Sequence, residues 1–155
     1  MKKLLTVVTF IFMSVVSLCA WDLEYEKDSQ GRETNTKRAV CYAEPIGYTG
    51  ALVVYPSGMY IVAKDNIKID KKLEVGSKVH FTFDTGESLT WAGVVEDNRI
   101  AIVTTKKYPI MREKFDFIVD QIKKSNSMIV TIDTIVGRRT MYIRNEKSRV
   151  ILNSL

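Results

Sequence analysis

Apolar and polar residues alternate one by one between Val79 and Val95, and this period constrains the fold more than any other feature of the sequence. A short polar segment, Asp84–Glu87, separates two apolar series. The first is Val79, Phe81 and Phe83, and the second is Leu89, Trp91 and Val95. Successive side chains of a β-strand point to opposite faces of its sheet, so a period of two predicts strands with one buried face and one exposed face. Aspartate and glycine in the intervening segment predict a turn. We therefore expect a β-hairpin that places Trp91 in the core.

Other short apolar segments are separated by turn residues in the same way. The clearest is Ala51–Ala63, where Pro56 presets the first turn angle and we expect Gly58 to take the left-handed position. The segment Glu96–Asn98 predicts another turn. Further strands are expected at Arg99–Thr104, at Met128–Val136 and Arg139–Arg144 hinged by Gly137, and at Val150–Leu152. The polar segment Asp28–Lys37 is expected to be an exposed loop.

One segment has the period of a helix instead. Its apolar residues recur at helical spacing: Met111, Phe115, Ile118, Val119 and Ile122. Pro109 suits the first turn of a helix, and Lys123 and Lys124 complement the helix dipole at the other end. We predict an amphipathic helix over about 109–124. The fold class is therefore mainly β, an antiparallel β-sandwich or partly open barrel with one α-helix.

The first twenty residues have the order of a secretory signal peptide. Lys2 and Lys3 precede an uncharged apolar stretch from Leu4 to Ala20, and acidic residues return directly afterwards. The apolar stretch of such a signal enters the export channel while the lysines stay cytoplasmic, and the signal is cut off after a small residue. We expect cleavage after Ala20, with Trp21 as the first residue of a periplasmic or secreted protein that keeps no stable membrane span.

Two other interpretations of this segment stay open. An uncleaved helical anchor would have only the 17 residues Leu4–Ala20, where a span takes about 20, and no cluster of positive residues follows them. A lipoprotein would be acylated at Cys19, which gives a lipid-anchored protein as the alternative localisation. The residue before that cysteine is the bulky Leu18, where a bacterial lipobox has a small residue.

The expected mature chain, residues 21–155, has the length of a single β-rich domain. Its 135 residues are enough to bury a core without disulfides. Cys41 is the one cysteine of this part, so no internal disulfide is possible. We expect a buried thiol, with an intermolecular bridge or a reactive thiol as the alternative.

Charge is distributed unevenly along the mature chain. Residues 21–98 carry 9 basic and 13 acidic residues, a net −4, whereas residues 99–155 carry 12 basic and 5 acidic residues, a net +7. A basic face would attract anionic glycans, lipid headgroups or an acidic protein. We nevertheless expect the charges to mix, because the two halves of a β domain usually interleave in its sheets.

The residues that catalysis or metal binding requires are few. His80 is the one histidine, and a nucleophilic serine or cysteine would need it as a base. One histidine and one cysteine fall short of the usual four zinc ligands. Acidic residues beside turns, such as Asp84 and Glu87, are more typical of solvated turns than of a glycosidase pair. We therefore expect no catalytic residue, no metal and no cofactor.

Tyrosines and basic pairs are the candidates for a binding surface. Tyr48 lies in Pro45–Gly50, a loop by composition, and an exposed aromatic residue there would suit a sugar or protein partner. The predicted binding residues are Tyr48, Tyr60, Lys106, Lys107, Arg138 and Arg139. Export would separate the basic pairs from the nucleic acid of the cell. The expected partner is therefore an envelope protein or an anionic glycan, and no nucleic acid.

Several features in order resemble a family of exported β-sandwich proteins. They are Trp21, a polar loop, the cysteine-bearing strand Arg38–Cys41, the hairpin Val79–Gly86 followed by Trp91, and a helix with Phe115 and Phe117. In these the chain resembles the invasion-associated locus B type of periplasmic protein and the small accessory β-sandwich proteins of secretion systems. The segment Ser57–Tyr60 is also similar to the Ser-Gly loop of periplasmic lysozyme inhibitors.

These features predict a non-enzymatic envelope protein that binds another macromolecule, because no catalytic set is recognisable. One alternative is a periplasmic inhibitor of a hydrolase such as lysozyme, with the turn Pro56–Tyr60 as its wedge. The other is a hydrolase that uses His80.

Overall fold

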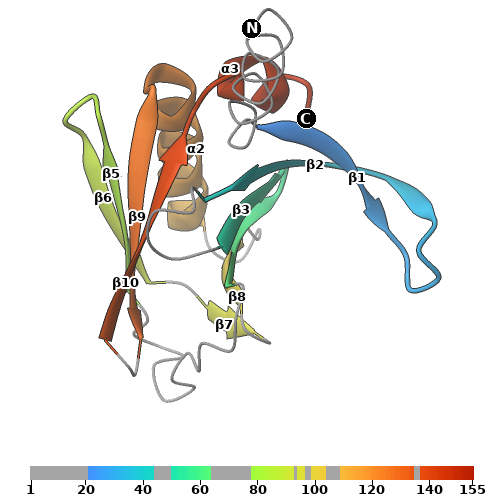
Figure 1. Cartoon of the computed structure of the whole chain (residues 1–155), viewed down its shortest axis with the longest axis horizontal. Coiled ribbons are helices and arrows are strands. Elements are labelled where there is room, and N and C mark those ends of the chain that lie inside the picture. Colours follow the sequence, from blue (N-terminus) through green and yellow to red (C-terminus); the bar gives the residue numbers. More distant parts are fainter. Residues whose placement is uncertain are drawn as a thin grey trace, which may run out of the picture.

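The computed structural model describes residues 21–43, 50–63, 78–92, 94–96, 99–103, 109–134 and 137–155. Within these ranges two antiparallel sheets face each other (Figure 1). One sheet has six strands in the order β1-β2-β3-β4-β8-β7, and the other has four in the order β10-β9-β5-β6. The predicted fold class, a mainly β antiparallel sandwich, is confirmed, and the described strands form no closed barrel.

The element bounds are as follows. The strands of the six-stranded sheet are β1 (Asp22–Lys27), β2 (Glu33–Tyr42), β3 (Gly50–Tyr55), β4 (Gly58–Ala63), β7 (Val94–Glu96) and β8 (Arg99–Val103). Those of the four-stranded sheet are β5 (Lys78–Phe83), β6 (Ser88–Ala92), β9 (Ser127–Thr134) and β10 (Gly137–Arg144). The helices are α2 (Pro109–Lys124) and α3 (Ser148–Leu152). The predicted bounds of the longer helix are confirmed.

The alternating hairpin forms as predicted, from β5 and β6. Val79 pairs with Trp91 and Phe81 pairs with Leu89, and Trp91 is buried in the core. Gly86 takes a φ of 91° in the turn between them, a value that glycine adopts without strain. The assignment of Val95 to the return strand is wrong, because β7 pairs with β8 in the other sheet.

The hairpin predicted at Ala51–Ala63 is also present, as β3 and β4. Tyr55 pairs with Gly58, so the connection is only Pro56 and Ser57. Gly58 therefore begins a strand and does not occupy the turn, which corrects the predicted role of this glycine. Gly137 has a φ of 109° at the start of β10, in agreement with the predicted hinge between the last two strands.

The loop predicted at Asp28–Lys37 is wrong. Strands β1 and β2 pair as far as Lys27 with Glu33, so that only Asp28–Arg32 remains as the turn. The polarity of this segment reflects its exposure on both faces, not an irregular backbone. Thr34 and Thr36 are β-branched residues that favour an extended chain.

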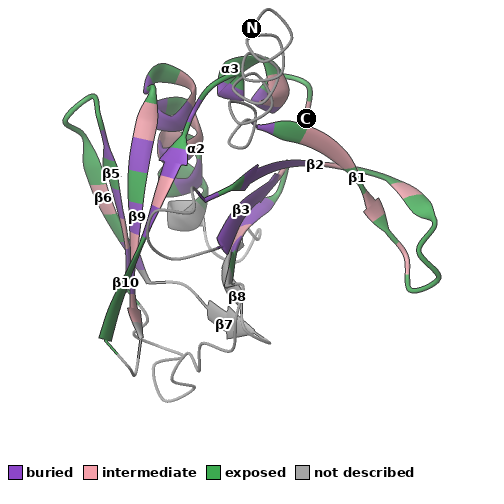
Figure 2. Ribbon diagram, in the orientation of Figure 1, coloured by how far each residue is buried: buried purple, intermediate pink, exposed green. Residues whose placement is uncertain are grey.

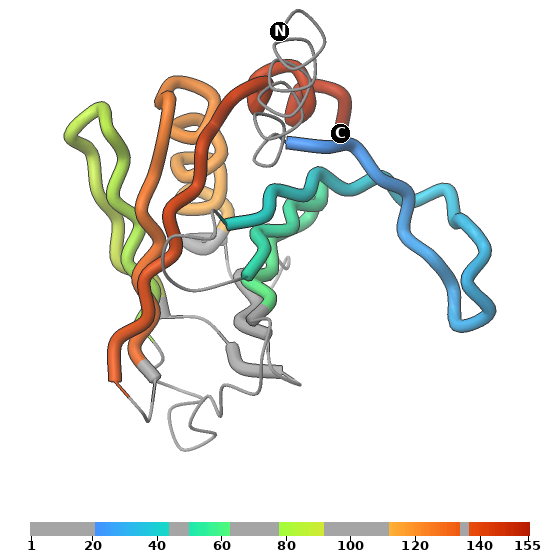
Figure 3. The backbone as a smooth tube through the Cα atoms, in the orientation of Figure 1, coloured from blue at the N-terminus to red at the C-terminus, as the bar shows by residue number. Residues whose placement is uncertain are grey.

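The same two strands extend beyond the sheet as a ribbon. Only Ala39–Tyr42 of β2 pairs with β3, so the segment Leu23–Arg38, which we call the arm, has no third strand among the described residues (Figure 1). The tube in Figure 3 shows it projecting away from the rest of the molecule. Its residues are exposed or half-buried throughout (Figure 2).

The strand predicted at Val150–Leu152 is wrong as well, because these residues lie in α3. Three consecutive apolar residues do not distinguish a helical period from a strand period. The hydroxyl of Ser148 donates to the carbonyl of Ile122 at 2.9 Å and so fixes the start of α3 against the end of α2. Val150 is exposed, whereas Leu152 faces the core.

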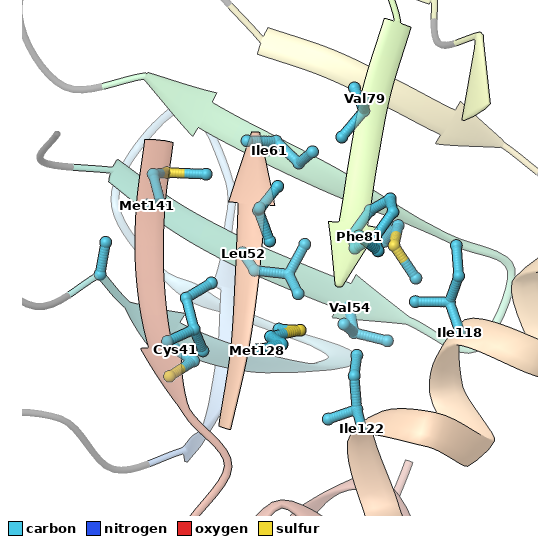
Figure 4. Close-up of a cluster of buried hydrophobic side chains, with 14 of the residues drawn as sticks. Cys41, Leu52, Val54, Ile61, Val79, Phe81, Ile118, Ile122, Met128 and Met141 are labelled. Atoms are coloured by element: carbon cyan, nitrogen blue, oxygen red, sulfur yellow. The ribbon is translucent and has the colours of Figure 1, made fainter. Parts of the chain in front are cut away.

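The core lies between the two sheets and is closed by α2 (Figure 4). Side chains from both sheets and from the helix meet there, among them Leu52, Ile61, Phe81, Ile118, Ile122, Met128 and Met141. Cys41 is fully buried among them, which confirms the prediction of a buried thiol. Its Sγ lies 3.6 Å from the carbonyl oxygen of Arg144.

A buried polar group joins the start of the described chain to its end. The indole Nε1 of Trp21, 1% exposed, donates to Oδ1 of Asn145 at 3.3 Å. The amide nitrogen of Asn145 donates in turn to the hydroxyl of Ser125 at 2.6 Å. Buried polar groups are stable when each has a hydrogen-bond partner, and Asn145 is the partner of two such groups, the Trp21 indole and the Ser125 hydroxyl.

We expect the substitution Asn145→Ala to lower the free energy of unfolding by about 1–3 kcal/mol, because it leaves the Trp21 indole N–H and the Ser125 hydroxyl buried without this partner. Urea unfolding of residues 21–155, followed by tryptophan fluorescence, measures the change. The exposed Asn153 is the matched control, for which Asn153→Ala should alter stability by less than about 0.5 kcal/mol. Equal effects of the two substitutions would contradict this role of Asn145.

Candidate functional site

The six-stranded sheet is apolar on both faces where β3 pairs with its neighbours β2 and β4. Leu52 and Val54 point into the main core, and the residue between them, Val53, points outward. On the outer side Val40, Ala51 and Val53 are nevertheless buried, packed against Tyr55 and Tyr60. A sheet with one solvated face would carry polar residues at these positions.

Strand register brings these outward residues together. Val40 pairs with Val53, and Val53 pairs with Tyr60, so the three form one row across the sheet. The ring of Tyr55 stands edge-on to that of Tyr60, with centroids 5.6 Å apart. We call this surface the tyrosine face: Arg38, Tyr42, Tyr55, Tyr60 and Val62 above a floor of Val40, Ala51 and Val53.

Arg38 is fixed at the border between the tyrosine face and the arm. Its guanidinium donates twice to one carboxylate oxygen of Glu24, at 2.9 and 3.2 Å. A hydrogen bond with Tyr55 and the nearby carboxylate of Glu24 raise the pKa of Arg38 above its usual value. The cation is therefore held in one position beside the tyrosine rings, with its charge permanent.

Part of the tyrosine face is open to solvent. Tyr42 is 52% exposed and Val62 37% exposed, at the opposite end of the face from Arg38. Tyrosine and arginine are the residue types that contribute most to binding at protein interfaces, especially above a well-packed apolar floor. This face therefore has the composition of a protein-binding surface.

The predicted binding residues do not form one site. Tyr60 lies on the tyrosine face, but Arg138 and Arg139 lie in the exposed first half of β10, in the other sheet. Nε of Arg138 donates to Oδ1 of Asp133 at 3.1 Å. The remaining predicted residues, Tyr48, Lys106 and Lys107, lie outside the described residues.

Sequence reasoning missed Arg38, Tyr42 and Tyr55 as site residues. The signal that could have found the face is the uninterrupted apolar run Ala51–Tyr55. A strand without alternation is buried on both sides, so something apolar has to lie on each. Only the pairing register, which the sequence does not state, identifies Arg38 and Tyr60 as the residues that share the outer side.

His80 belongs to a chain of polar contacts on the outer face of the four-stranded sheet. Its Nδ1 lies 2.8 Å from the hydroxyl of Thr90, and its Nε2 lies 3.5 Å from a carboxylate oxygen of Asp133. A hydrogen bond from Arg138 lowers the pKa of Asp133 below its usual value, and His80 contributes to the shift. Both ring nitrogens thus face neighbours in the sheet, an arrangement that supports cross-strand stabilisation. A hydrolase role of His80 stays a prediction.

The two halves of the chain interleave, as expected. Strand β8 lies between β4 and β7 of the acidic first half, and β9 pairs with β5, so both sheets contain strands from both halves. Among the described residues no group of three or more histidine, cysteine, aspartate or glutamate side chains could hold a metal ion. No helix in the described part of the chain has the length and apolarity to cross a membrane.

Comparison with protein-family models, with curated proteins and with solved structures finds no match for this chain. No relative therefore assigns a role to any residue of the tyrosine face. The resemblance to exported β-sandwich families stays a prediction.

The turn of the arm is organised by one carboxylate. Oδ1 of Asp28 accepts hydrogen bonds from the backbone N–H groups of Gln30 and Arg32, at 2.8 and 3.0 Å, and Oδ2 accepts one from Nε of Arg32. Gly31 takes a φ of 79° in this turn. The backbone hydrogen bond from Arg32 is the main cause that lowers the pKa of Asp28 below its ordinary 3.8. The arm is therefore ordered at its tip by ionised Asp28.

We expect the tip of the arm to lose order as the pH falls through the lowered pKa of Asp28. A carboxylate whose pKa is lower in the folded than in the unfolded chain stabilises the fold above 3.8, and this contribution disappears on acidification. NMR titration should give a carboxyl midpoint for Asp28 below 3.8, with the amide signals of Gly31 and Arg32 moving at that midpoint. In the control Asp28→Asn this movement should vanish. A midpoint at or above 3.8 would contradict the prediction.

Proposed function

We propose that this chain is an exported protein that binds a protein partner of the cell envelope through its tyrosine face. The observation that supports the proposal is the gathering of Tyr42, Tyr55, Tyr60 and Arg38 on the outer side of a sheet whose floor is already buried and apolar. Tyrosine gives a large contact area at a low entropic cost, and a fixed arginine adds directional hydrogen bonds. No catalytic step is required of these residues.

The arm enlarges the area that a partner would contact. It starts at the edge of the tyrosine face, because Arg38 of β2 and Glu24 of β1 form the ion pair between the two. Tyr25, which is 41% exposed, pairs with Lys37, one position along from that ion pair, so its side chain lies on the opposite face of the arm from Arg38. A stable protein interface buries about 800 Å² on each side, more than a few tyrosines supply. The tyrosine face and the side of the arm that carries Glu24 together offer one extended surface for such a partner.

The inhibitor hypothesis involves the same part of the molecule. The turn at Pro56 and Ser57 directly follows Tyr55, and the Pro56 carbonyl accepts a hydrogen bond of 3.4 Å from Arg112 of α2, which holds the turn in place. Identification of the captured partner tests this hypothesis. A hydrolase captured on the tyrosine face would make inhibition the activity of this site.

We expect Tyr60→Ala and Val62→Glu each to weaken partner binding about 10- to 100-fold, which corresponds to about 1.4–2.7 kcal/mol. The mature chain, residues 21–155, serves as bait in an envelope extract; the captured protein is identified by mass spectrometry and then titrated by calorimetry. Val62 is already exposed, so its substitution leaves folding intact.

Two controls lie on the other sheet. Tyr142→Ala removes a half-buried tyrosine there, and the double substitution Arg138→Glu with Arg139→Glu reverses the predicted basic pair. Neither should change the affinity for the captured protein. Equal capture by Val62→Glu and the unmodified chain, or loss of binding only in the arginine variant, would overturn the assignment to the tyrosine face.

Export is the second part of the proposal. The lysine-led apolar stretch that ends at Ala20 supports it, and so does the position of Trp21, whose side chain is buried beside Asn145 directly after the proposed cut. The envelope fraction should contain a chain whose mass corresponds to residues 21–155. A mass that includes residues 1–20, or a lipid adduct that disappears in Cys19→Ser, would contradict cleavage after Ala20.

A further inference from the structure

A hollow of about 340 Å³ lies at one end of the outer face of the four-stranded sheet, on the side of the molecule opposite the tyrosine face. Its lining comes from the start of β9, the end of β10 and the connections on either side: Asn126, Ser127, Tyr142, Arg144, Asn145 and Glu146. Arg144 pairs with Ser127 and Tyr142 pairs with Ile129, which places both long side chains on the outer side of this sheet. Ligand sites range upward from about 300 Å³, so the hollow is large enough for a ligand of one ring.

The backbone around the hollow is held at several points. The N–H of Asn145 donates to the carbonyl of Asn126 at 2.8 Å, and the N–H of Asn126 donates to the carboxylate of Asp84 at 3.1 Å. The side chain of Asn145 is bonded to both Trp21 and Ser125. The lining residues therefore project from a scaffold that is tied to the core, which is the arrangement that a preformed binding site requires.

The chemistry of the lining excludes most simple ligands. Arg144 and Glu146 bring one charge of each sign to the lining, so the hollow has no net charge that would favour a metal ion or phosphate. Amide, hydroxyl and charged groups make most of the lining polar, which is unfavourable for a lipid chain. A neutral ligand with many hydroxyl groups suits this lining, because carboxylate, amide and guanidinium groups hydrogen-bond to hydroxyls as acceptors and donors.

We propose that this hollow binds one pyranose ring of a neutral oligosaccharide. The ring of Tyr142 would offer an apolar surface to the C–H face of the sugar, and Asn126 and Glu146, which line the same hollow, would hydrogen-bond to its hydroxyl groups. A lining that combines one aromatic ring with several polar groups matches a pyranose, which has apolar C–H faces and hydroxyl groups around its edge.

The adjoining sheet surface suits the continuation of such a chain. Beyond the hollow the outer face carries a row of paired residues, most of them with hydroxyl groups: Thr140, Thr131, His80 and Thr90. The row of Tyr142 continues through Ile129, which is 39% exposed, and ends in Thr82 and Ser88. An oligosaccharide that extends from the hollow would thus meet one apolar side chain, Ile129, and a surface otherwise rich in hydroxyl groups.

The test is an NMR titration of isotope-labelled residues 21–155 with three neutral trisaccharides: maltotriose, cellotriose and the trimer of N-acetylglucosamine. We expect at least one of them to give saturable shifts at the amides of Asn126, Tyr142 and Glu146. Tyr142→Ala and Glu146→Gln should each weaken that binding about 10-fold or more. The matched control Tyr42→Ala removes a tyrosine of the other sheet and should leave the sugar affinity unchanged.

Several outcomes would overturn the proposal. They are no shift with any of the three sugars, shifts that persist unchanged in Tyr142→Ala, and shifts produced at these amides by inorganic phosphate or a neutral tetrapeptide but by no sugar. The proposal does not rest on protein binding at the tyrosine face. Val62→Glu should bind the sugar normally even where it no longer captures the protein partner, so the two proposals fail separately.

Discussion

Burial of the central strands on both faces is the constraint on which the rest of this structure depends. Strands β3 and β4 carry apolar side chains inward, where the four-stranded sheet and α2 cover them, and also outward, where tyrosines do. The hydrophobic effect does not distinguish between the two sides, so each needs a cover of low polarity. On the inner side that cover is a whole second sheet; on the outer side it is Tyr55 and Tyr60, whose rings have hydroxyl groups that stay compatible with water.

The two outer surfaces of the sandwich therefore have opposite characters. One combines tyrosines with the fixed guanidinium of Arg38, and the other is rich in threonine and serine and carries the His80 contacts with Thr90 and Asp133. The first has the apolar floor and aromatic residues of a protein interface. The second has the composition of a solvated sheet, with a hollow at one end. A protein with two such surfaces is suited to hold a protein on one side and a polar chain on the other, which is how the two proposals fit in one molecule.

Local periodicity was sufficient to predict the elements whose two sides differ. The hairpin around Gly86 and the helix Pro109–Lys124 follow directly from periods of two and of about 3.6. The sequence of the arm predicts a loop, because a strand that is polar on both faces shows no two-residue period. The sequence of α3 predicts a strand, because the helix is too short to show a helical period. The contact between Trp21 and Asn145 spans 124 positions of the chain and has no local signal at all. The tyrosine face is predictable only in part: the sequence contains its apolar run, but it does not state the strand register that brings the face together.

The arm and the sandwich differ in local stability. Its outer edge and both of its faces meet water, and a two-stranded ribbon by itself is of marginal stability, whereas the strands behind it share a common core. Amide protons of β1 within the arm should exchange with solvent through brief local openings that leave the sandwich closed. A partner bound to the arm would slow this amide exchange without altering the cooperative unfolding of the domain. Binding at the arm can therefore be measured separately from global stability.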